Sequence, residues 1–443
     1  MYFFYSLLYT LAFVLMSPLF LLRRSKYAAG FSERLGNYPE FKRDERPMIW
    51  LHCVSVGETN AARPLVDELI SNFPGHRLIV STTTKTGQTL ARDIFKDKAD
   101  AVFYFPFDWK FSVRCALDNF QPSVVLLMET EIWPRFFRES HLSGAKIAIV
   151  NGRLSEKSVA RYSYIKTFVR NVLGNVDLAL MQGESDAERI RSLGIDADKV
   201  RVTGNMKFDL ELSAADEAIT GDIDSKFQFS SSRPLIIAAS THEPEERWML
   251  EAFCSLFNGD TKPRLMIAPR HPERFDSVAK MIDEFRNDDA CEWRQYIFAR
   301  RSDKPTNTDG DADVVLLDSI GELRAVYPLA DVVFVGGSLI RHGGQSVLEP
   351  AAAGKAILTG CHTHNFEDVI RTFENNKAVI RISESDDSLI VDELFTKVTD
   401  LLGDQQRLSN MGIAAAAVMK ANRGATAKTL DCLSPLLGPS KNQ

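Results

Sequence analysis

The sequence lacks closely spaced cysteine pairs, and this absence excludes two common stabilising features. None of its six cysteines, scattered along 443 residues, belongs to a CxxC pair. A zinc ribbon needs such pairs, and disulfide frameworks are typical of short secreted chains rich in cysteine. The composition therefore indicates a reducing compartment, without a structural zinc site or a disulfide framework. The cysteines are Cys53, Cys115, Cys254, Cys291, Cys361 and Cys432.

An excess of positive charge is also absent. Lys and Arg number 53 against 59 Asp and Glu, so the formal net charge is -6. A broadly basic nucleic-acid binder is therefore excluded, although local basic patches are compatible with this balance. The sequence has no strand-linked GxGxxG, no GxSxG elbow and no Walker A loop. These absences argue against a dehydrogenase, an α/β-hydrolase and a P-loop nucleotidase.

The first 22 residues contain no charged side chain. A helix of about 20 apolar residues reaches across a hydrocarbon core of roughly 30 Å. Arg23, Arg24 and Lys26 follow at once, and the positive-inside rule places them in the cytoplasm. We therefore predict a membrane-anchor helix over 1–22, with the rest of the chain on the cytoplasmic side. Spanning the membrane and lying in one leaflet both stay open, and a buried core helix is the alternative.

After this segment, two stretches of chain alternate short apolar runs with helical patterns. Continuous apolar strands indicate parallel sheets buried on both faces. We predict an α/β fold of two Rossmann-like, doubly wound domains that face a cleft. The predicted segments are the anchor at 1–22, a first domain at 23–206, a linker at 207–232 and a second domain at 233–443. The predicted strands are 48–55, 77–84, 124–130, 146–152, 178–182, 234–241, 264–271, 314–319, 331–338 and 355–360.

Acidic residues follow two predicted strands of the first half. Glu58 stands beside a helix start after WLHCVSVGE, where a carboxylate caps the helix or serves as a general base. Glu129 and Glu131 end the run VVLLMETE, and strand alternation predicts that both lie on one face. Buried acids need a partner or solvent, so a structural salt bridge is the alternative to a functional site.

The second half carries residues suited to phosphate binding. Arg270, at a predicted strand end, can form bidentate bonds to a phosphate, and a surface ion pair is the alternative. Glycine pairs at 336–337 and 343–344 allow the backbone to approach a ligand closely. A helix predicted to open at Gln345–Leu348 offers its N–H groups to a phosphate, and Glu349 can accept bonds from ribose hydroxyls.

Two groups of potential metal ligands have unsuitable positions. The DGDAD run at 309–313 lies in a polar loop before a strand, whereas the DxD acids that bind metal-nucleotide complexes end a strand. His342, His362 and His364 contain no i,i+4 pair of the kind that zinc sites use. We therefore expect no metal and no cofactor.

Short stretches in order along nearly the whole chain match one family. They are ERLGNYP (33–39), WLHCVSVGE (50–58), FPFDW (105–109), METEIWP (128–134), NGRLSEKS (151–158), TGNMKFD (203–209), STHEPEE (240–246), PRHPERF (269–275), DSIGELRAVY (318–327), GGSL (336–339) and LEPAAAGKAILTG (348–360). With the apolar N-terminal segment, they resemble the 3-deoxy-D-manno-octulosonic acid (Kdo) transferases of Gram-negative lipopolysaccharide assembly.

The resemblance implies a GT-B fold and an inverting, metal-independent glycosyltransferase that uses CMP-Kdo. The implied acceptor is lipid IVA, the lipid A precursor. The implied partners are CMP-Kdo, lipid IVA and inner-membrane phospholipids, with no nucleic acid. The resemblance assigns Glu58 as the catalytic base, and Glu129 and Lys207 as residues that stabilise the transition state.

The resemblance also assigns contacts with the CMP group to the second half. These residues are Pro269, Arg270, Ile320, Gly321, Glu322, Ser346, Val347, Leu348 and Glu349. Candidate contacts with the acceptor or donor are Glu33, Arg34, Ser55, Gly57, Glu131, Ser240 and His242. A structural ion pair is the alternative for Glu33 and Arg34.

The chain departs from the family's pattern on the donor side. Gln345-Ser346 stands where the family often has His-Asn, Cys361 where proline is common, and His364 where an aromatic residue is common. These changes affect the loops near the donor. A nucleotide-sugar epimerase of similar fold and a non-catalytic membrane scaffold are the alternative functions. The sequence gives neither the number of Kdo residues added nor the oligomeric state.

Overall fold

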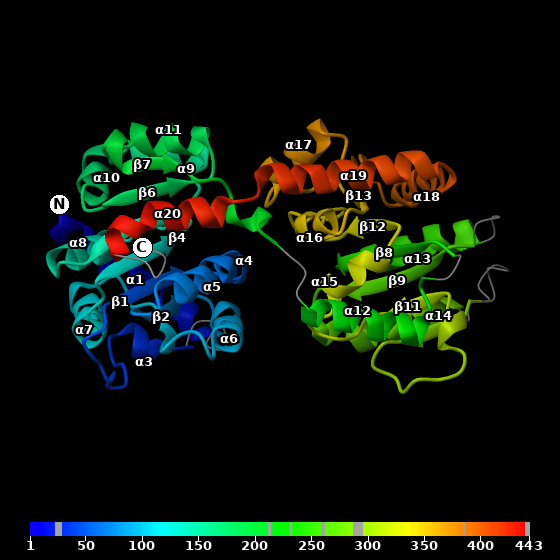
Figure 1. Cartoon of the computed structure of the whole chain (residues 1–443), viewed down its shortest axis with the longest axis horizontal. Coiled ribbons are helices and arrows are strands. Elements are labelled where there is room, and N and C mark those ends of the chain that lie inside the picture. Colours follow the sequence, from blue (N-terminus) through cyan, green and yellow to red (C-terminus); the bar gives the residue numbers. More distant parts are fainter. Residues whose placement is uncertain are drawn as a thin grey trace. The chain divides into compact units, whose positions relative to one another are not determined.

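The computed structural model describes residues 1–22, 29–210, 214–230, 233–257, 262–286, 296–384 and 386–438. The chain divides into two compact units, one of Met1–Asp209 with Asn422–Gln443 and one of Leu210–Ala421. Within the described residues, each unit holds one sheet of seven parallel strands (Figure 1). The prediction of two Rossmann-like α/β domains is confirmed. Arg23, Arg24 and Lys26, predicted to flank the anchor, lie outside the described residues.

The sheet of the first unit has the order β3-β2-β1-β4-β5-β6-β7. Its strands are β1 (Met48–Cys53), β2 (Arg77–Thr82), β3 (Ala101–Tyr104), β4 (Val124–Met128), β5 (Lys146–Gly152), β6 (Leu178–Met181) and β7 (Val200–Val202). Every residue of β1, β2 and β4 is buried, as the continuous apolar runs predicted. The order reverses between β1 and β4, and doubly wound sheets bind ligands beyond the carboxyl ends of strands at such a switch point.

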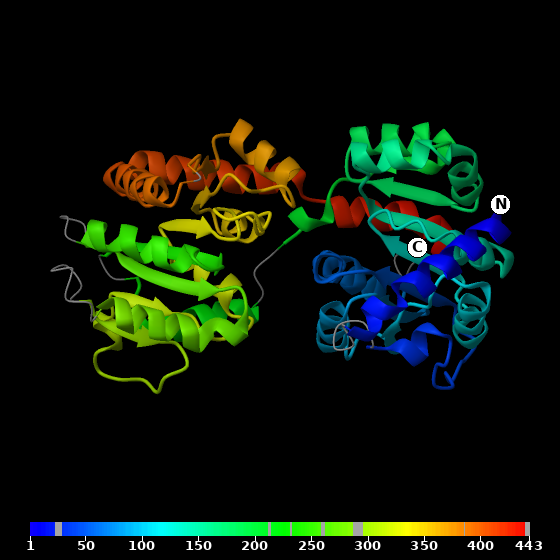
Figure 2. The same ribbon diagram turned by 180° about the vertical axis from the view of Figure 1, so that it is seen from behind.

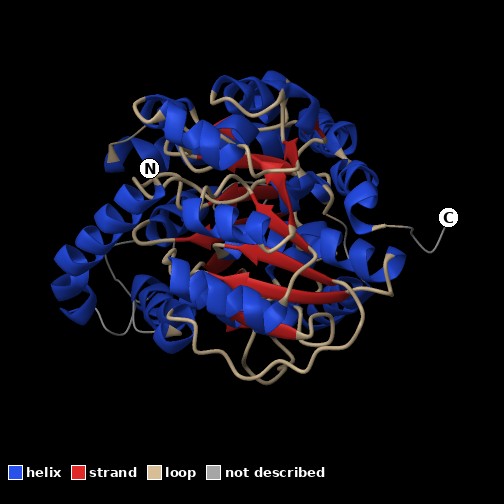
Figure 3. Ribbon diagram, turned by 90° about the vertical axis from the view of Figure 1, so that its left-hand side faces the viewer, coloured by secondary structure: helices blue, strands red, loops and turns tan. Residues whose placement is uncertain are grey.

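Helices cover both faces of the strands (Figure 3). In the first unit they include α3 (Phe31–Arg34), α4 (Val56–Ala61), α5 (Arg63–Asn72), α6 (Lys85–Ile94), α7 (Lys110–Phe120), α8 (Pro134–Leu142), α9 (Glu156–Ser163), α10 (Lys166–Leu173) and α11 (Glu184–Ser192). The core on one face centres on Trp50, whose ring contacts Phe103, Phe120 and Phe136. Burial of such aromatic groups is the main driving force for this packing.

The apolar N-terminal segment forms α1 (Tyr2–Leu22), which lies against the first unit (Figure 2). The Tyr5 hydroxyl donates to the Asp108 carboxylate at 2.7 Å. Arg135 donates to Ser6 Oγ at 2.8 Å and to the Tyr2 carbonyl at 2.9 Å. Within the described part of the chain, no helix has the length and hydropathy that crossing a bilayer requires.

The C-terminal helix α20 (Ala425–Leu437) returns to the first unit. Its leucines pack in a cluster with side chains of β1, β4 and β5. The Asp209 carboxylate accepts bonds from the Gly424 and Thr426 amides at 2.7 and 2.6 Å, and so caps the start of this helix. The structural division therefore differs from the expected segment 233–443, because the last helix buries its apolar face on the first sheet.

The sheet of the second unit has the order β10-β11-β9-β8-β12-β13-β14, and its switch point lies between β8 and β12. Its strands are β8 (Leu235–Thr241), β9 (Arg264–Pro269), β10 (Phe298–Arg300), β11 (Val314–Leu316), β12 (Val332–Val335), β13 (Ala356–Thr359) and β14 (Ile380–Arg381). The helices include α12 (Ala214–Phe227), α13 (Glu245–Phe257), α14 (Phe275–Arg286), α15 (Leu323–Val326), α16 (Leu348–Ala352), α17 (Glu367–Asn375), α18 (Asp387–Gly403) and α19 (Gln405–Asn422).

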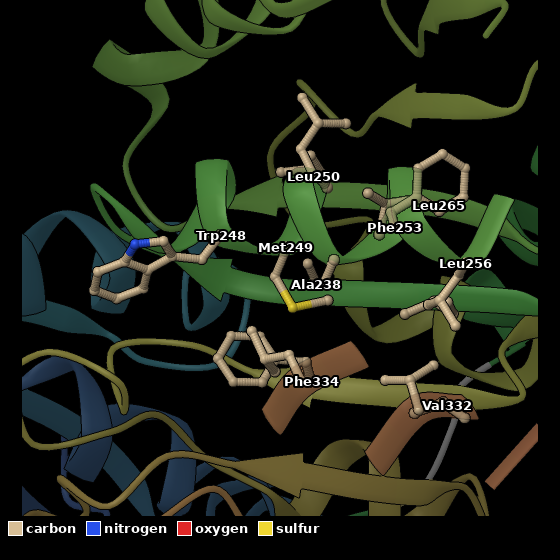
Figure 4. Close-up of a cluster of buried hydrophobic side chains, with 14 of the residues drawn as sticks. Ala238, Trp248, Met249, Leu250, Phe253, Leu256, Leu265, Val332 and Phe334 are labelled. Carbon is tan, nitrogen blue, oxygen red and sulfur yellow. The ribbon is translucent and has the colours of Figure 1, made fainter. Parts of the chain in front are cut away.

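Helix α13 is fixed on the second sheet by large apolar side chains. Trp248, Met249 and Phe253 are buried in one cluster with Ala238 of β8 and Phe334 of β12 (Figure 4). These two strands flank the switch point, so the start of α13 is held close to the loops that follow them.

Candidate active site

Glu58 lies in the first turn of α4, the helix that follows β1 at the carboxyl edge of the first sheet. It is only 7% exposed, and its carboxylate accepts bonds from the Val54 amide at 2.7 Å and from Ser55 Oγ at 3.2 Å. The pKa of Glu58 is raised to about 8, first by burial and second by the neighbouring Glu129 charge, while the bond from the Val54 N–H opposes this rise. The side chain thus binds the turn that leads into α4, and it also titrates where a general base is effective.

Glu129 and Lys207 form an ion pair beside Glu58. The Lys207 Nζ lies 2.7 Å from Glu129 Oε1, and both side chains are partly buried. Glu129 has a φ of 54°, in the left-handed region that few non-glycine residues adopt. Such backbone strain, about 1–3 kcal/mol, is concentrated at functional sites.

Strand alternation predicted that Glu129 and Glu131 lie on one face of the sheet. Strand β4 ends at Met128, so strand alternation does not extend to these two residues. Their charges still interact, because burial and then the Glu129 charge raise the pKa of Glu131. Glu58 therefore lies with two other acids, Glu129 and Glu131, and one lysine at the switch point of the first sheet.

Two asparagines that the sequence reasoning missed hold Lys207 in place. Asn151, buried at the end of β5, accepts a bond from the Met206 amide at 2.9 Å through its side-chain oxygen. Asn205 accepts from the Lys207 amide at 3.0 Å. The signal was an asparagine at a strand end and another before a short helical turn, which are common positions for side-chain to backbone bonds.

The other candidate contacts of the first unit have structural partners. Glu33 accepts a bond from the Tyr104 amide at 2.7 Å, and Arg34 donates to the Thr83 carbonyl and lies over the Tyr104 ring. Ser55 donates to Glu58. Gly57 is exposed, and a Cβ there would meet only Ser55 Oγ, at 3.8 Å, so close packing does not require glycine. Substrate contact at these positions stays a prediction.

In the second unit, the residues predicted to bind CMP lie in loops after different strands. Pro269 ends β9, and the Arg270 amide bonds to the Thr241 carbonyl at 3.0 Å while its side chain is exposed. Ile320 is 79% exposed, and Gly321 has a φ of 87°. Glu322 is held by Arg301, whose Nε and Nη2 donate at 2.9 and 3.0 Å.

The loop after β12 is longer than predicted, because the strand ends at Val335. Helix α16 starts at Leu348, the last residue of the predicted opening at 345–348, and has only five residues. Ser346 Oγ accepts from the Leu348 amide at 3.3 Å, while Val347 and Leu348 are buried and Glu349 is partly exposed. Such a short helix has a weak dipole, so individual N–H groups here matter more than the macrodipole.

The departures from the family pattern lie next to this loop. Gly343 has a φ of 104°, and a Cβ on it would come within 2.7 Å of both Asn365 and His364 side chains. Cys361 is partly exposed. His364 therefore packs against a glycine of the loop after β12.

His242 lies in a group of three imidazoles at the same sheet edge. Its ring centroid is 4.1 Å from that of His342 and 5.3 Å from that of His271. Burial and then the His342 and His271 charges lower the pKa of His242 to about 4, so its ring is neutral at pH 7. Ser240, two residues earlier, has a φ of 53°.

The acidic DGDAD run has protein partners. Asp309 accepts bonds from Thr306, and Asp313 pairs with Arg233 at 2.6 Å. Among the described residues, no three His, Cys, Asp or Glu side chains come together in an arrangement that could hold a metal ion.

Solved structures with this architecture define the class of fold. The chain resembles a UDP-GlcNAc 2-epimerase from Neisseria meningitidis, with 14% identity, a TM-score of 0.58, and coverage of 87% of this chain and 99% of that one. It also resembles a glycosyltransferase from Rickettsia africae, with 14% identity, a TM-score of 0.54, and coverage of 90% and 100%. These similarities show the fold alone, and that fold is GT-B-like.

The sequence relatives specify the family within this class. Residues 29–210 match the model described as 3-Deoxy-D-manno-octulosonic-acid transferase (kdotransferase). The chain is 32% identical over 439 residues to a 3-deoxy-D-manno-octulosonic acid transferase of Haemophilus influenzae, covering 97% of this chain and 98% of that protein. It is also 32% identical to the Bordetella pertussis transferase of the same name, covering 97% and 99%. The chain belongs to the 3-deoxy-D-manno-octulosonic acid transferase family and is a glycosyltransferase, so the predicted resemblance is confirmed.

Proposed function

We propose that this glycosyltransferase moves Kdo from CMP-Kdo to lipid IVA in lipopolysaccharide core synthesis and inverts the anomeric configuration. The observation that supports it most directly is Glu58, a buried carboxyl group whose pKa is about 8, beside the 2.7 Å pair of Glu129 and Lys207. A base whose pKa is near the working pH transfers protons efficiently.

The proposed reaction is a single displacement. Ionised Glu58 accepts the proton of the acceptor sugar's 6′-hydroxyl while that oxygen forms a bond to the anomeric carbon of Kdo. The bond from this carbon to the phosphate oxygen breaks, and CMP leaves with the electron pair. Lys207, oriented by Glu129, eases the approach of oxygen to a carbon that carries a carboxylate.

In this proposal, the second unit binds the CMP group. The exposed Arg270 guanidinium can form bidentate bonds to the phosphate, and the backbone around Ser346 supplies further donors. Glu322, fixed by Arg301, and Glu349 provide acceptors for hydroxyl groups. Ser240 and His242, at the end of β8, are candidate contacts with the donor sugar.

Incubating the purified protein with CMP-Kdo and lipid IVA tests this function. We expect release of CMP that requires lipid IVA, together with lipid products heavier by one or more Kdo units in the mass spectrum. Those products also give the number of Kdo residues transferred. Release of CMP without any change in the lipid would contradict the proposed acceptor, and absence of both would contradict the donor.

We further propose that α1 attaches the enzyme to the inner membrane by lying on the surface of the bilayer. One side of the helix is bonded to Asp108 and Arg135 of the first unit. The side chains that remain exposed are large and apolar: Phe3, Phe4, Leu7, Leu8, Leu11, Val14, Leu15 and Met16. Burying such a face in the headgroup region is favourable, and it brings the enzyme to a lipid acceptor.

Charged substitutions on this face should weaken membrane binding. The double variant Leu8→Glu and Leu15→Glu replaces side chains that are 64% and 71% exposed, so the fold should be kept. Each buried leucine contributes roughly 1.5–3 kcal/mol, and we expect co-sedimentation with anionic phospholipid vesicles to fall by more than about tenfold. Ile413→Glu on α19, also 64% exposed, is the matched control. Equal binding by wild type and double variant would refute attachment through α1.

A further inference from the structure

A buried carboxylate at the switch point of the second sheet has no role in the function proposed above. Glu245 is the first residue of α13, and its exposed fraction is 0%. The loops after β8 and β12, on either side of the switch point, both meet this side chain. An ionised group in such a position needs several hydrogen bonds to offset its desolvation.

Four backbone amides supply these bonds. Glu245 Oε2 accepts from His242 N at 2.9 Å and from Gly337 N at 2.7 Å. Oε1 accepts from Ser338 N and from Leu339 N, each at 3.0 Å. Because all four partners are donors and an ionised carboxylate only accepts, the arrangement fits the charged form.

The backbone closes tightly on this carboxylate. A Cβ on Gly336 would lie 2.8 Å from Glu245 Oε2 and 2.8 Å from Thr241 Cα. Only glycine fits at this point, since both neighbours would clash with a side chain. The two loops and the start of α13 therefore form one packed unit.

Hydrogen bonds extend from this unit toward the residues that we propose bind CMP. The Gly337 carbonyl accepts from the Gly344 amide at 2.7 Å, two residues before Ser346. Ser338 Oγ accepts from the Gly360 amide at 2.8 Å, at the end of β13. A carboxylate on α13 thus sets the position of the whole glycine-rich loop.

We propose that Glu245 is a positioning residue for the nucleotide of the donor: its carboxylate holds the 336–346 loop and the 240–242 turn in the conformation that binds CMP. The inference rests on the proposed function of this loop. It assigns to the first glutamate of STHEPEE a role in donor affinity, without contact with the reacting atoms.

The variant Glu245→Gln tests this inference. Its amide keeps one oxygen acceptor but turns an NH2 group toward two backbone N–H groups. We expect the KM for CMP-Kdo and the Kd for CMP to rise about tenfold or more, with the KM for the lipid acceptor unchanged. Hydrogen exchange of the 336–346 amides in the ligand-free protein should become faster, and this measurement does not depend on the proposed activity.

The neighbouring Glu246 provides a matched control. It is 2% exposed on the same helix, but it pairs with the Arg274 side chain and not with the loop. Glu246→Gln should lower thermal stability while leaving the CMP-Kdo KM and the exchange of 336–346 unchanged. The inference would be overturned if Glu245→Gln bound CMP as tightly as the wild type. It would also be overturned if Glu245→Gln lost no more CMP affinity than Glu246→Gln.

If Glu245→Gln fails to fold, Glu245→Asp decides the question. Its shorter side chain keeps the charge but cannot reach all four backbone amides. We expect the CMP affinity to fall about threefold or more. Unchanged affinity would overturn the inference. Failure of the wild-type protein to bind CMP would refute the proposed function instead, while the exchange comparison would still test the role of Glu245.

Discussion

Glu58→Gln should lower kcat by a factor of about 10² to 10⁴ with the fold intact. The amide has nearly the same shape, and its oxygen can still accept the bond from Val54, but it cannot accept a proton from the acceptor hydroxyl. Initial rates of CMP release at saturating lipid IVA measure this loss. Glu139→Gln is the control, because Glu139 is a 3% exposed acid of the same unit that pairs with Arg114. A kcat of Glu58→Gln close to that of the wild type would contradict the role of Glu58 as the catalytic base.

The pH dependence gives this prediction a second measurement. Because burial raises the pKa of Glu58 to about 8, the carboxyl group is mostly protonated at pH 7. The wild-type kcat/KM should therefore rise with pH, reach half its maximum near pH 8 and level off above about 9, and Glu58→Gln should lack this rise. A wild-type rate that is flat between pH 6 and 9 would contradict the role of Glu58 as base.

The free energy of unfolding should fall over the pH range in which kcat/KM rises. A raised carboxyl pKa means that the native state binds a proton that the unfolded chain releases, so stability falls as pH rises from the ordinary value of 4.5 toward about 8. A neutral amide at position 58 avoids this loss. At pH 8.5, Glu58→Gln should therefore unfold at a temperature at least as high as that of the wild type, which separates lost catalysis from lost folding.

Lys207→Met should lower kcat by about 10² to 10³, because the variant loses the cation proposed to offset developing negative charge. The methionine fills a similar volume, but Glu129 loses its 2.7 Å partner. Lys199→Met is the matched control: Lys199 belongs to the same unit and is 29% exposed, against 26% for Lys207. A kcat within a few-fold of wild type for Lys207→Met would contradict the proposed role of the cation.

Glu129→Gln should lower kcat by a similar factor, and it should also shift the pH profile of kcat/KM. The Glu129 charge is the second cause, after burial, that raises the pKa of Glu58. Removing it lowers this pKa, so the rise of kcat/KM should move to lower pH, whereas Lys207→Met should not move it in that direction. Because the two residues act as one pair, the double variant should lose less than the product of the single losses.

The main strands and the class of fold could be predicted from the sequence, because strands buried on both faces need continuous apolar runs. Strands β3, β7, β10 and β14 were not predicted, since they have only two to four residues and carry no usable periodicity. The return of α20 to the first unit was not predicted either. The amphipathic pattern of a helix predicts that one of its faces is buried, but it does not show which of the two sheets that face covers.

The site could be predicted only as residue types at strand ends. The sequence placed Glu58 and Glu129 after apolar runs, and the resemblance to the family added Lys207. Neither gave the 2.7 Å contact of the pair, the φ of 54° at Glu129 or the raised pKa of Glu58, since these depend on residues far apart in the chain. Asn151, Asn205 and Glu245 were missed because asparagine and glutamate are common at strand ends and helix starts, and the sequence does not show which of them hold a functional segment in place.

By itself, the sequence determined the composition of two parallel α/β cores, the family, and the residues that can accept protons or bind phosphate. Apolar patterning and ordered motifs carry this information along the chain. Only the tertiary structure decided that α1 lies against the first unit and that α20 returns to it. It also decided that β1 and β4 meet at a switch point where burial and the Glu129 charge raise the pKa of Glu58. Burial and Coulomb interactions depend on distances in space, which the order of residues does not contain.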